Sequence, residues 1–271
     1  MPEASDPIAV LLLAVIQGVA EFLPISSSGH LVLGRHLMDV PDMSMAFDVA
    51  LHVGTLAAVL VAYRKDVRKL LGDVFTGNLK LAIWLVVATI PVGIAGLTLK
   101  DYIEEHLRSA QAVGGCLLFT AVILIVAEIS RTRRAGASPV APSEGPEREP
   151  SLRHAVIIGC AQVLALAPGV SRSGTTIAAA MLLGYDGKQA ARLSFLMSIP
   201  AISGAAIVAL PDAMESGFQE GSAGLIVGAV ILAALVGFGS LRALVLTLSK
   251  GSFRWFAGYC AIVGVTAIFF M

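Results

Sequence analysis

The sequence is poor in charged residues. Asp, Glu, Lys and Arg together make up 14% of its 271 residues, whereas 56% are hydrophobic. A soluble domain of this length carries roughly 25% charged residues, so the composition indicates an integral membrane protein whose partner is the bilayer. The 19 basic and 19 acidic residues give a formal net charge of zero. This balance gives no indication of a nucleic-acid partner.

Cysteine is also scarce, and the first residues lack basic side chains. Cys116, Cys160 and Cys260 lie singly in apolar runs, without a Cys-x-x-Cys pair, so we expect neither a zinc site nor a disulfide framework. Residues 1–7 contain Glu3 and Asp6 but no Lys or Arg. A cleaved signal peptide begins with a basic region, so we expect the N-terminus to be retained.

The apolar runs are of two lengths. A helix needs about 20 apolar residues to cross a hydrocarbon layer of roughly 30 Å. Six runs approach this length, namely 45–63, 79–99, 110–129, 190–210, 222–248 and 253–271. The runs 8–22, 29–38, 154–167 and 174–184 are shorter. We interpret them as two re-entrant helix-break-helix hairpins, 8–38 and 154–184, because broken backbone at membrane depth survives only inside protein or beside a watery cavity.

The connections between the runs differ in charge. Basic connections of membrane proteins face the cytoplasm, and two connections here are basic, with Arg64, Lys65, Arg68 and Lys69 in one and Arg131, Arg133 and Arg134 in the other. The connections 100–109 and 211–221 are acidic and should face outward.

The two broken runs are similar in sequence. An offset of 145 residues places Gln162 on Gln17, Ser171 on Ser26, and Ser173-Gly174 on Ser28-Gly29. The same offset places run 45–63, which ends in a basic loop, on run 190–210, which ends in an acidic one. The sequence therefore predicts an all-α polytopic membrane protein built as an inverted-topology repeat, with about six full transmembrane helices and two re-entrant hairpins. The first repeat is 1–130, a cytoplasmic linker is 131–150, and the second repeat is 151–271.

Polar residues concentrate at the two breaks. Gln17 and Glu21 are four residues apart and share one helix face, and Arg172 lies between the two apolar runs of the second break. Either charged residue alone is explained by a helix end that reaches water. Because ionisable residues in membrane helices usually line functional cavities, the two together favour a site.

Serines precede the helix that follows each break. The segments are Ser26-Ser27-Ser28-Gly29 and Ser171-Arg172-Ser173-Gly174. A serine in this position is often only an N-cap, but the same geometry exposes backbone N–H groups and the positive end of a helix dipole, which bind phosphate. The planar fork of Arg172 can bond two phosphate oxygens. Together these features predict one composite site for a diphosphate.

Two histidines lie near these motifs. His30 follows the first break directly, beside three hydroxyls, and we assign it to the site. Asp48 and His52 form a second (i, i+4) pair near the start of a span. They line the entrance of the site or lie at the membrane interface, and the sequence does not separate these alternatives.

The motifs resemble those of the bacterial undecaprenyl-diphosphate phosphatases of the bacitracin-resistance type. The resemblance rests on Gln-x-x-x-Glu at 17–21, Phe-Leu-Pro-Ile-Ser-Ser-Ser-Gly-His at 22–30 and Pro-Gly-Val-Ser-Arg-Ser-Gly at 168–174, and it covers nearly the whole chain. It implies hydrolysis of the terminal phosphate of a C55 polyprenyl diphosphate, which regenerates the monophosphate carrier of cell-wall synthesis. It further implies a bacterial cytoplasmic (inner) membrane protein with divalent-metal dependence and an active site open to the periplasm.

Our hypothesis for the chemistry is nucleophilic phosphoryl transfer. Ser27 attacks the terminal phosphorus, Glu21 or His30 accepts its proton, and Arg172 with the helix N-termini stabilises the developing charge. Ser26 and His30 remain alternative nucleophiles. A Mg²⁺ or Ca²⁺ ion would bridge Glu21 and the diphosphate. The residues expected to bind substrate are Gln17, Ser26, Ser28, Ser171, Ser173, Gly174 and Thr176.

The alternative function is that of a polyprenyl-phosphate flippase or anion transporter. Inverted repeats with broken helices recur in transporters, and an arginine with helix N-termini can bind an anion without cleaving it. Phosphate release by protein in detergent would favour the enzyme, because transport leaves no chemical product there. A homodimer also remains open, because glycines permit close helix packing within or between chains, as at Gly114-Gly115, Gly224/Gly228 and Gly237/Gly239.

Overall fold

The computed structural model describes residues 6–40, 43–137, 149–216, 221–250 and 252–271, and within these residues all regular structure is helical. The helices are α1 (Pro7–Phe22), α2 (Ser27–Met38), α3 (Met45–Ala62), α4 (Arg64–Phe75), α5 (Lys80–His106), α6 (Ala110–Ala137), α7 (Leu152–Val163), η1 (Leu164–Leu166), α8 (Arg172–Leu182), α9 (Gly187–Ser216), α10 (Ala223–Lys250) and α11 (Arg254–Phe270). The predicted all-α class is confirmed.

Five of the six predicted spans are helices long and apolar enough to cross a bilayer: α3, α5, α6, α9 and α10. The sixth is found as α11, whose 17 residues rise only about 26 Å at about 1.5 Å per residue. Its start is fixed by α6, because the N–H of Phe253 donates to Glu128 Oε2 (3.2 Å). Across the described residues, five helices therefore meet the length and composition of a full span, against about six expected. Helix α6 also runs to Ala137, into the segment predicted as a linker, and residues 138–148 of that segment lie outside the described residues.

Each of the two sequence breaks separates a pair of short helices, and the two helices of each pair form a hairpin. Helices α1 and α2 pack together, as do α7 and α8. Proline lacks an N–H and interrupts a helix, and Pro24 and Pro168 lie in the two breaks. A serine then restarts each helix, because Ser26 Oγ accepts from the N–H of Gly29 (3.3 Å) and Ser171 Oγ from the N–H of Gly174 (3.1 Å).

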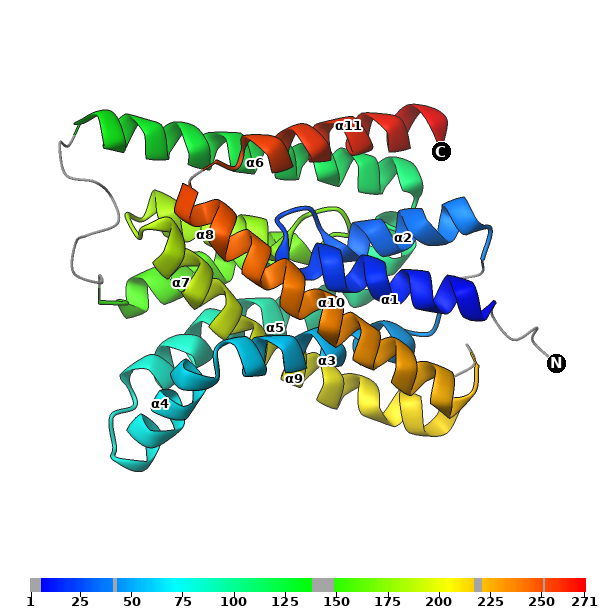
Figure 1. The fold of residues 1–271 in the computed structure, drawn as a ribbon, viewed down its shortest axis with the longest axis horizontal. Helices are drawn as coiled ribbons and strands as arrows, with labels where there is room; N and C mark the ends of the chain where they lie inside the picture. The colour runs from blue at the N-terminus through cyan, green and yellow to red at the C-terminus, as the bar shows by residue number, and fades with distance from the viewer. Residues whose placement is uncertain (1–5, 41–42, 138–148, 217–220, 251) are drawn as a thin grey trace.

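The hairpins point in opposite directions. In Figure 1 the α1–α2 hairpin opens toward the end of the molecule where both termini lie, and α7–α8 opens toward the end that carries α4. Each hairpin packs on a long helix of the other half, α1 on α10 and α7 on α5. Small residues permit these close contacts: a Cβ at Gly18 would lie 2.9 Å from Ala233 O, and one at Gly159 would lie 2.5 Å from Ala88 O.

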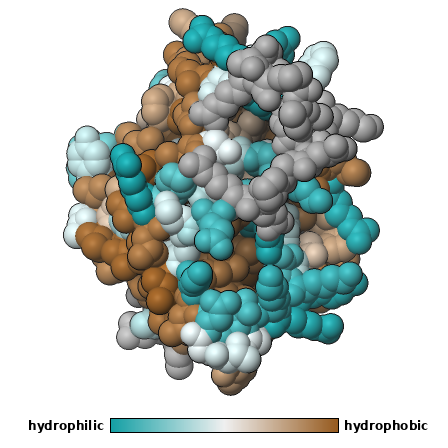
Figure 2. Space-filling model, turned by 90° about the vertical axis from the view of Figure 1, so that its left-hand side faces the viewer, coloured by the Kyte–Doolittle hydropathy of each residue, from teal (hydrophilic) through white to brown (hydrophobic). Residues whose placement is uncertain are grey.

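The ends and flanks of the bundle differ in polarity. Helix α4 and the end of α6, both basic, lie at the same end of the molecule (Figure 1). Viewed from that end, hydrophilic side chains gather over much of the face, beside broad apolar areas (Figure 2). The long helices expose large apolar side chains such as Ile90, Leu97, Leu235 and Ile262. This distribution is typical of a multi-pass protein whose flanks contact lipid and whose ends contact water.

Candidate active site

The two breaks meet in the interior, where segments about 145 residues apart are in direct contact. The N–H of Gly169 donates to Ser26 Oγ (3.1 Å), and Ser173 Oγ donates to Leu23 O (3.1 Å). A Cβ at Gly29 would lie only 2.7 Å from Gly169 Cα. Gly169 has φ 102°, which glycine adopts without a steric penalty. The junction is therefore built from both halves of the chain.

Glu21 lies at the centre of this junction and is 5% exposed. Its Oε2 accepts from Gln17 Nε2 (3.0 Å) and from Ser27 Oγ (2.6 Å), and its Oε1 pairs with the guanidinium of Arg172. Breaking a buried ion pair typically destabilises a protein by about 3–5 kcal/mol, so these partners hold the carboxylate in place. Four of the residues predicted from sequence thus form one cluster from α1, α2 and α8.

The three serines of the first break have different surroundings. Ser26 Oγ accepts from the N–H groups of Gly29 and Gly169, and it lies 3.4 Å from Ser28 Oγ. Ser28 is half-buried, whereas Ser26 and Ser27 are buried. Ser27 Oγ donates to Glu21, which is the contact that an activated nucleophile needs. The geometry favours Ser27 over Ser26 as the attacking hydroxyl.

His30 lies beside the junction, but its ring contacts other groups. Nδ1 is 2.8 Å from Ser26 O, and Nε2 is 2.8 Å from the hydroxyl of Tyr259 on α11. A carbonyl only accepts, so Nδ1 carries the proton and Nε2 accepts from the tyrosine. With both nitrogens so engaged, Glu21 is the better placed acceptor for the proton of Ser27.

The polar side chains of the second break hold its turn. Ser171 Oγ lies 3.2 Å from Ser173 Oγ. Thr176 Oγ1 donates to Arg172 O (2.7 Å) and lies 2.6 Å from Ser194 Oγ. Ser171, Ser173 and Thr176 are each buried to 2% exposure or less. Together with Gly174, they shape the turn that presents Arg172 to Glu21.

Two contributors were not among the predicted site residues. His52 Nε2 lies 3.5 Å from Glu21 Oε2, while its Nδ1 donates to Asp48 O (2.7 Å). The sequence left open whether Asp48 and His52 line the site or lie at the membrane interface, and the structure places His52 in the lining of the site. Thr120 on α6 holds the second break, because Oγ1 donates to Gly169 O (2.8 Å) and accepts from Ser171 N (3.1 Å). The (i, i+4) spacing of Asp48 and His52 indicated a possible role for His52, whereas no local sequence pattern indicated one for Thr120.

Glu21 is also the residue that the sequence analysis predicts to bind a metal ion. Across the described residues, groups of three or more His, Cys, Asp or Glu that could hold a metal are absent. A carboxylate offers about four lone-pair positions, and Gln17, Ser27 and Arg172 occupy three of them. Mg²⁺ often binds one carboxylate together with substrate phosphates and waters. The donors therefore fit a cation that arrives with a phosphorylated substrate, and they do not form a closed resident site.

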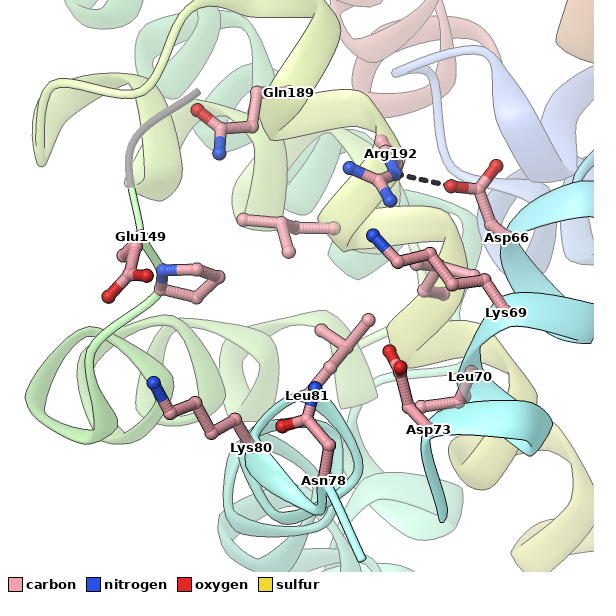
Figure 3. Close-up of a pocket in the computed structure, with 13 residues that line it drawn as sticks. Asp66, Lys69, Leu70, Asp73, Asn78, Lys80, Leu81, Glu149, Gln189 and Arg192 are labelled. Carbon is pink, nitrogen blue, oxygen red and sulfur yellow. Dashed lines mark hydrogen bonds and ion pairs between the residues drawn. The ribbon is translucent and has the colours of Figure 1, made fainter. Parts of the chain in front are cut away.

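A separate cavity of about 260 Å³ lies between α4, α5 and α9, at the end of the molecule that carries α4 (Figure 3). Arg192 Nε donates there to Asp66 Oδ1 (2.6 Å). The charged lining consists of the acids Asp66, Asp73 and Glu149 and the bases Lys69, Lys80 and Arg192. Because these charges balance, the cavity offers no excess positive charge to a diphosphate, and the cluster around Glu21 remains the candidate site.

The fold and the junction define a class: a multi-pass membrane protein with a buried hydroxyl–carboxylate pair, beside an arginine at the start of one of the two helices that begin there. Over residues 10–266 the chain matches the model of the family described as bacitracin resistance protein BacA. The chain belongs to this family, which confirms the resemblance noted in its motifs.

Named relatives agree with this assignment. The chain is 40% identical to the undecaprenyl-diphosphatase of Desulfosudis oleivorans and 39% identical to that of Halothermothrix orenii. It is 37% identical to undecaprenyl-diphosphatase 3 of Bacillus anthracis. In each case the match covers 96% of this chain and 96% of the relative.

Proposed function

We propose that this chain is an integral membrane phosphatase that hydrolyses the terminal phosphate of undecaprenyl diphosphate. The product, undecaprenyl phosphate, would return to cell-wall synthesis as the lipid carrier. The observation that carries the proposal is the contact of Ser27 Oγ with Glu21 Oε2 at 2.6 Å, beside an arginine supplied by the other half of the chain. The three relatives named undecaprenyl-diphosphatase support the substrate.

The reaction proceeds in two steps on the residues of the cluster. Ser27 Oγ attacks the terminal phosphorus while Glu21 Oε2 accepts its proton, and the bridging P–O bond breaks with its electron pair leaving on undecaprenyl phosphate. Water then attacks the phosphoserine, Glu21 returns its proton to Ser27 Oγ, and inorganic phosphate leaves. The proton lost by the water departs with the phosphate.

Arg172 and the two helix N-termini stabilise the charge that builds up on the phosphate oxygens. A guanidinium has five donors, so Arg172 can bind phosphate while it keeps a bond to Glu21 Oε1. Helices α2 and α8 both begin at the junction, and their first N–H groups favour an anion there. Groups fixed in place before the reaction lower its barrier most effectively.

We also propose that a Mg²⁺ or Ca²⁺ ion accompanies the diphosphate and that Glu21 would hold it together with the substrate. When bound, it would neutralise part of the substrate charge. Because Glu21 is the one carboxylate of the junction among the described residues, binding of the ion to the protein alone should be weak. Titration of protein with Mn²⁺, with and without substrate, measures this difference directly.

Transport of polyprenyl phosphate by the same site is the alternative. An anion-binding site has no need of a hydroxyl hydrogen-bonded to a buried carboxylate, whereas a serine nucleophile requires both groups. The pairing of Ser27 with Glu21 therefore favours hydrolysis.

We propose that the chain is inserted as an inverted repeat, with α1–α2 and α7–α8 as re-entrant hairpins. Two contacts that the offset of 145 exchanges support this, because Gly29 corresponds to Gly174 and Pro24 corresponds to Gly169. A Cβ at Gly29 would meet Gly169, and a Cβ at Gly174 would meet Pro24 Cβ at 3.2 Å. The basic end with α4 would face the cytoplasm. The α1–α2 hairpin would then open to the periplasm, across the bacterial cytoplasmic membrane.

A homodimer is a further part of the proposal. A Cβ at Gly114 would lie 2.7 Å from Gly264 O, so this glycine serves packing within the chain. A Cβ at Gly115 or Gly228 would meet nothing within 4 Å in the described structure, which leaves room for a second copy. Cross-linking in membranes through cysteines introduced at these two positions tests the contact.

The function is tested by phosphate release from undecaprenyl diphosphate by purified protein in detergent, with and without EDTA. Glu21→Ala and Arg172→Ala should each reduce kcat by at least about 10²-fold, since each removes a group that acts on the transition state. Arg153→Ala is the matched control, because Arg153 is exposed on α7. Folded wild-type protein that releases no phosphate would contradict the proposal and direct attention to transport.

A further inference from the structure

Ser26 has an unusual backbone conformation. Its φ is 71° and its ψ is 100°, in a helix-start position where residues other than glycine rarely adopt positive φ. Such a conformation persists only where the surrounding structure holds it, and it occurs preferentially at functional sites. Ser26 directly precedes Ser27, so its torsion angles set the direction in which the Ser27 side chain leaves the break.

Contacts from two segments, α2 and the opposite break, hold Ser26. Its Oγ accepts from the N–H of Gly29 in α2 and from the N–H of Gly169 in the opposite break. Its carbonyl accepts from Nδ1 of His30 (2.8 Å). The carbonyl also accepts from the backbone N–H of His30 (3.2 Å), so the imidazole supplies its second and shorter contact.

The His30 ring is itself held from α11. The hydroxyl of Tyr259 lies 2.8 Å from Nε2, and the two rings are stacked with centroids 5.5 Å apart and an angle of 11° between their planes. A ring with Nδ1–H directed at a carbonyl and Nε2 accepting from a phenol is neutral and cannot rotate without losing both bonds.

We propose that Tyr259 and His30 are positioning residues that hold Ser26 at positive φ and thereby direct Ser27 Oγ at Glu21. This inference rests on the proposed function and assigns to His30 a role through Ser26, in place of proton transfer or nucleophilic attack. It also gives α11, whose Cys260 Sγ lies 3.7 Å from Pro24 O in the first break, a defined part in activity.

The first test removes the hydroxyl alone. Tyr259→Phe keeps the stacked ring and should lower kcat about tenfold with KM unchanged, in line with the loss of one hydrogen bond in a positioning network. Tyr102→Phe is the matched control, because Tyr102 on α5 also stacks on a histidine, His106, with centroids 4.5 Å apart, but Nδ1 of that histidine lies 3.1 Å from Tyr102 O and does not contact Ser26. An unchanged kcat for Tyr259→Phe would overturn the part assigned to α11.

The second test separates positioning from chemistry at His30. The amide N–H of an asparagine can replace Nδ1–H at the Ser26 carbonyl, so His30→Asn should retain most of the kcat that His30→Ala loses. Ser26→Gly adopts positive φ without strain, so His30→Ala should lose less activity in the Ser26→Gly background. If His30→Asn is as inactive as His30→Ala in both backgrounds, the histidine does chemistry and the inference is wrong.

A measurement independent of activity completes the experiment. Hydrogen–deuterium exchange of segment 23–30 should accelerate in His30→Ala and Tyr259→Phe and stay at the wild-type rate in Tyr102→Phe. Unchanged exchange in the first two variants would overturn the inference, whatever the substrate. If the variants differ in exchange as expected but the wild-type protein hydrolyses no diphosphate, only the proposed function is contradicted.

Discussion

At the scale of single residues, the site depends on one buried carboxylate that several groups share. Gln17, Ser27 and Arg172 all contact Glu21, and an unpaired charge in such surroundings would be strongly destabilising. The contacts that stabilise the junction are therefore the same contacts that orient the reacting groups. Substitutions that keep charge but change geometry should separate the two roles.

Arg172→Lys is such a substitution. Lysine keeps the positive charge beside Glu21 but lacks the planar fork that binds two oxygens together. We expect kcat to fall by about 10²–10³-fold, while the thermal unfolding midpoint in detergent stays near that of the wild type. Arg153→Lys, at an exposed position of α7, should leave both quantities unchanged. Near-wild-type kcat in Arg172→Lys would show that the fork is not used.

His52 provides a second test at this scale. Its Nδ1 is bonded to Asp48 O, so Nε2 faces Glu21 Oε2 at 3.5 Å. We expect His52→Leu to lower kcat about tenfold, because a polar neighbour of the carboxylate is lost. His52→Gln should keep most of the activity, since its amide can donate to the same oxygen. Equal losses in steady-state kinetics of both variants would show that the ring acts only by filling space.

At the scale of elements, the close approach of the two breaks decides the geometry of the site. A Cβ at Gly29 would lie 2.7 Å from Gly169 Cα, closer than non-bonded carbon atoms approach. Gly29→Ala should therefore separate the breaks, lower stability by about 1–3 kcal/mol and reduce phosphate release. Gly258→Ala on α11, where a Cβ would meet nothing within 4 Å of the described structure, is the control for thermal unfolding. Equal unfolding midpoints would contradict the tight junction.

The elements themselves were largely predictable, because the signals that end and restart them are local. Pro24 and Pro168 interrupt apolar runs, and the capping serines Ser26 and Ser171 follow within three residues. The duplicated motif also led to the prediction that Arg172 and Glu21 belong to one composite site. The partner of His30 was not predictable, since Tyr259 is 229 residues away and lies in an apolar run without a distinguishing pattern. The start of α11 depends equally on a distant contact, that of Phe253 with Glu128.

At the scale of the whole molecule, each half supplies what the other lacks. The first half contributes Glu21 and Ser27, the second contributes Arg172, and the long helices α5 and α10 each pack on the hairpin of the opposite half. Neither half alone contains the full cluster. The proposed opposite insertion of the halves would bring their breaks to a common depth, where two helix N-termini can face one ligand.

This arrangement predicts a definite pattern of accessibility. We expect Ile8→Cys at the start of α1 and Glu105→Cys at the end of α5 to react with a membrane-impermeant maleimide on intact spheroplasts. Arg68→Cys in α4 and Arg153→Cys in α7 should react only after permeabilisation, because basic ends face the cytoplasm. All four positions are exposed. The protein that receives these cysteines would carry Ala in place of Cys116, Cys160 and Cys260, so that only the introduced cysteine reacts.

Retained phosphate release would show that each variant is folded. Labelling of Ile8→Cys and Arg153→Cys from the same side would rule out oppositely directed hairpins, since the starts of α1 and α7 lie at opposite ends of the molecule (Figure 1).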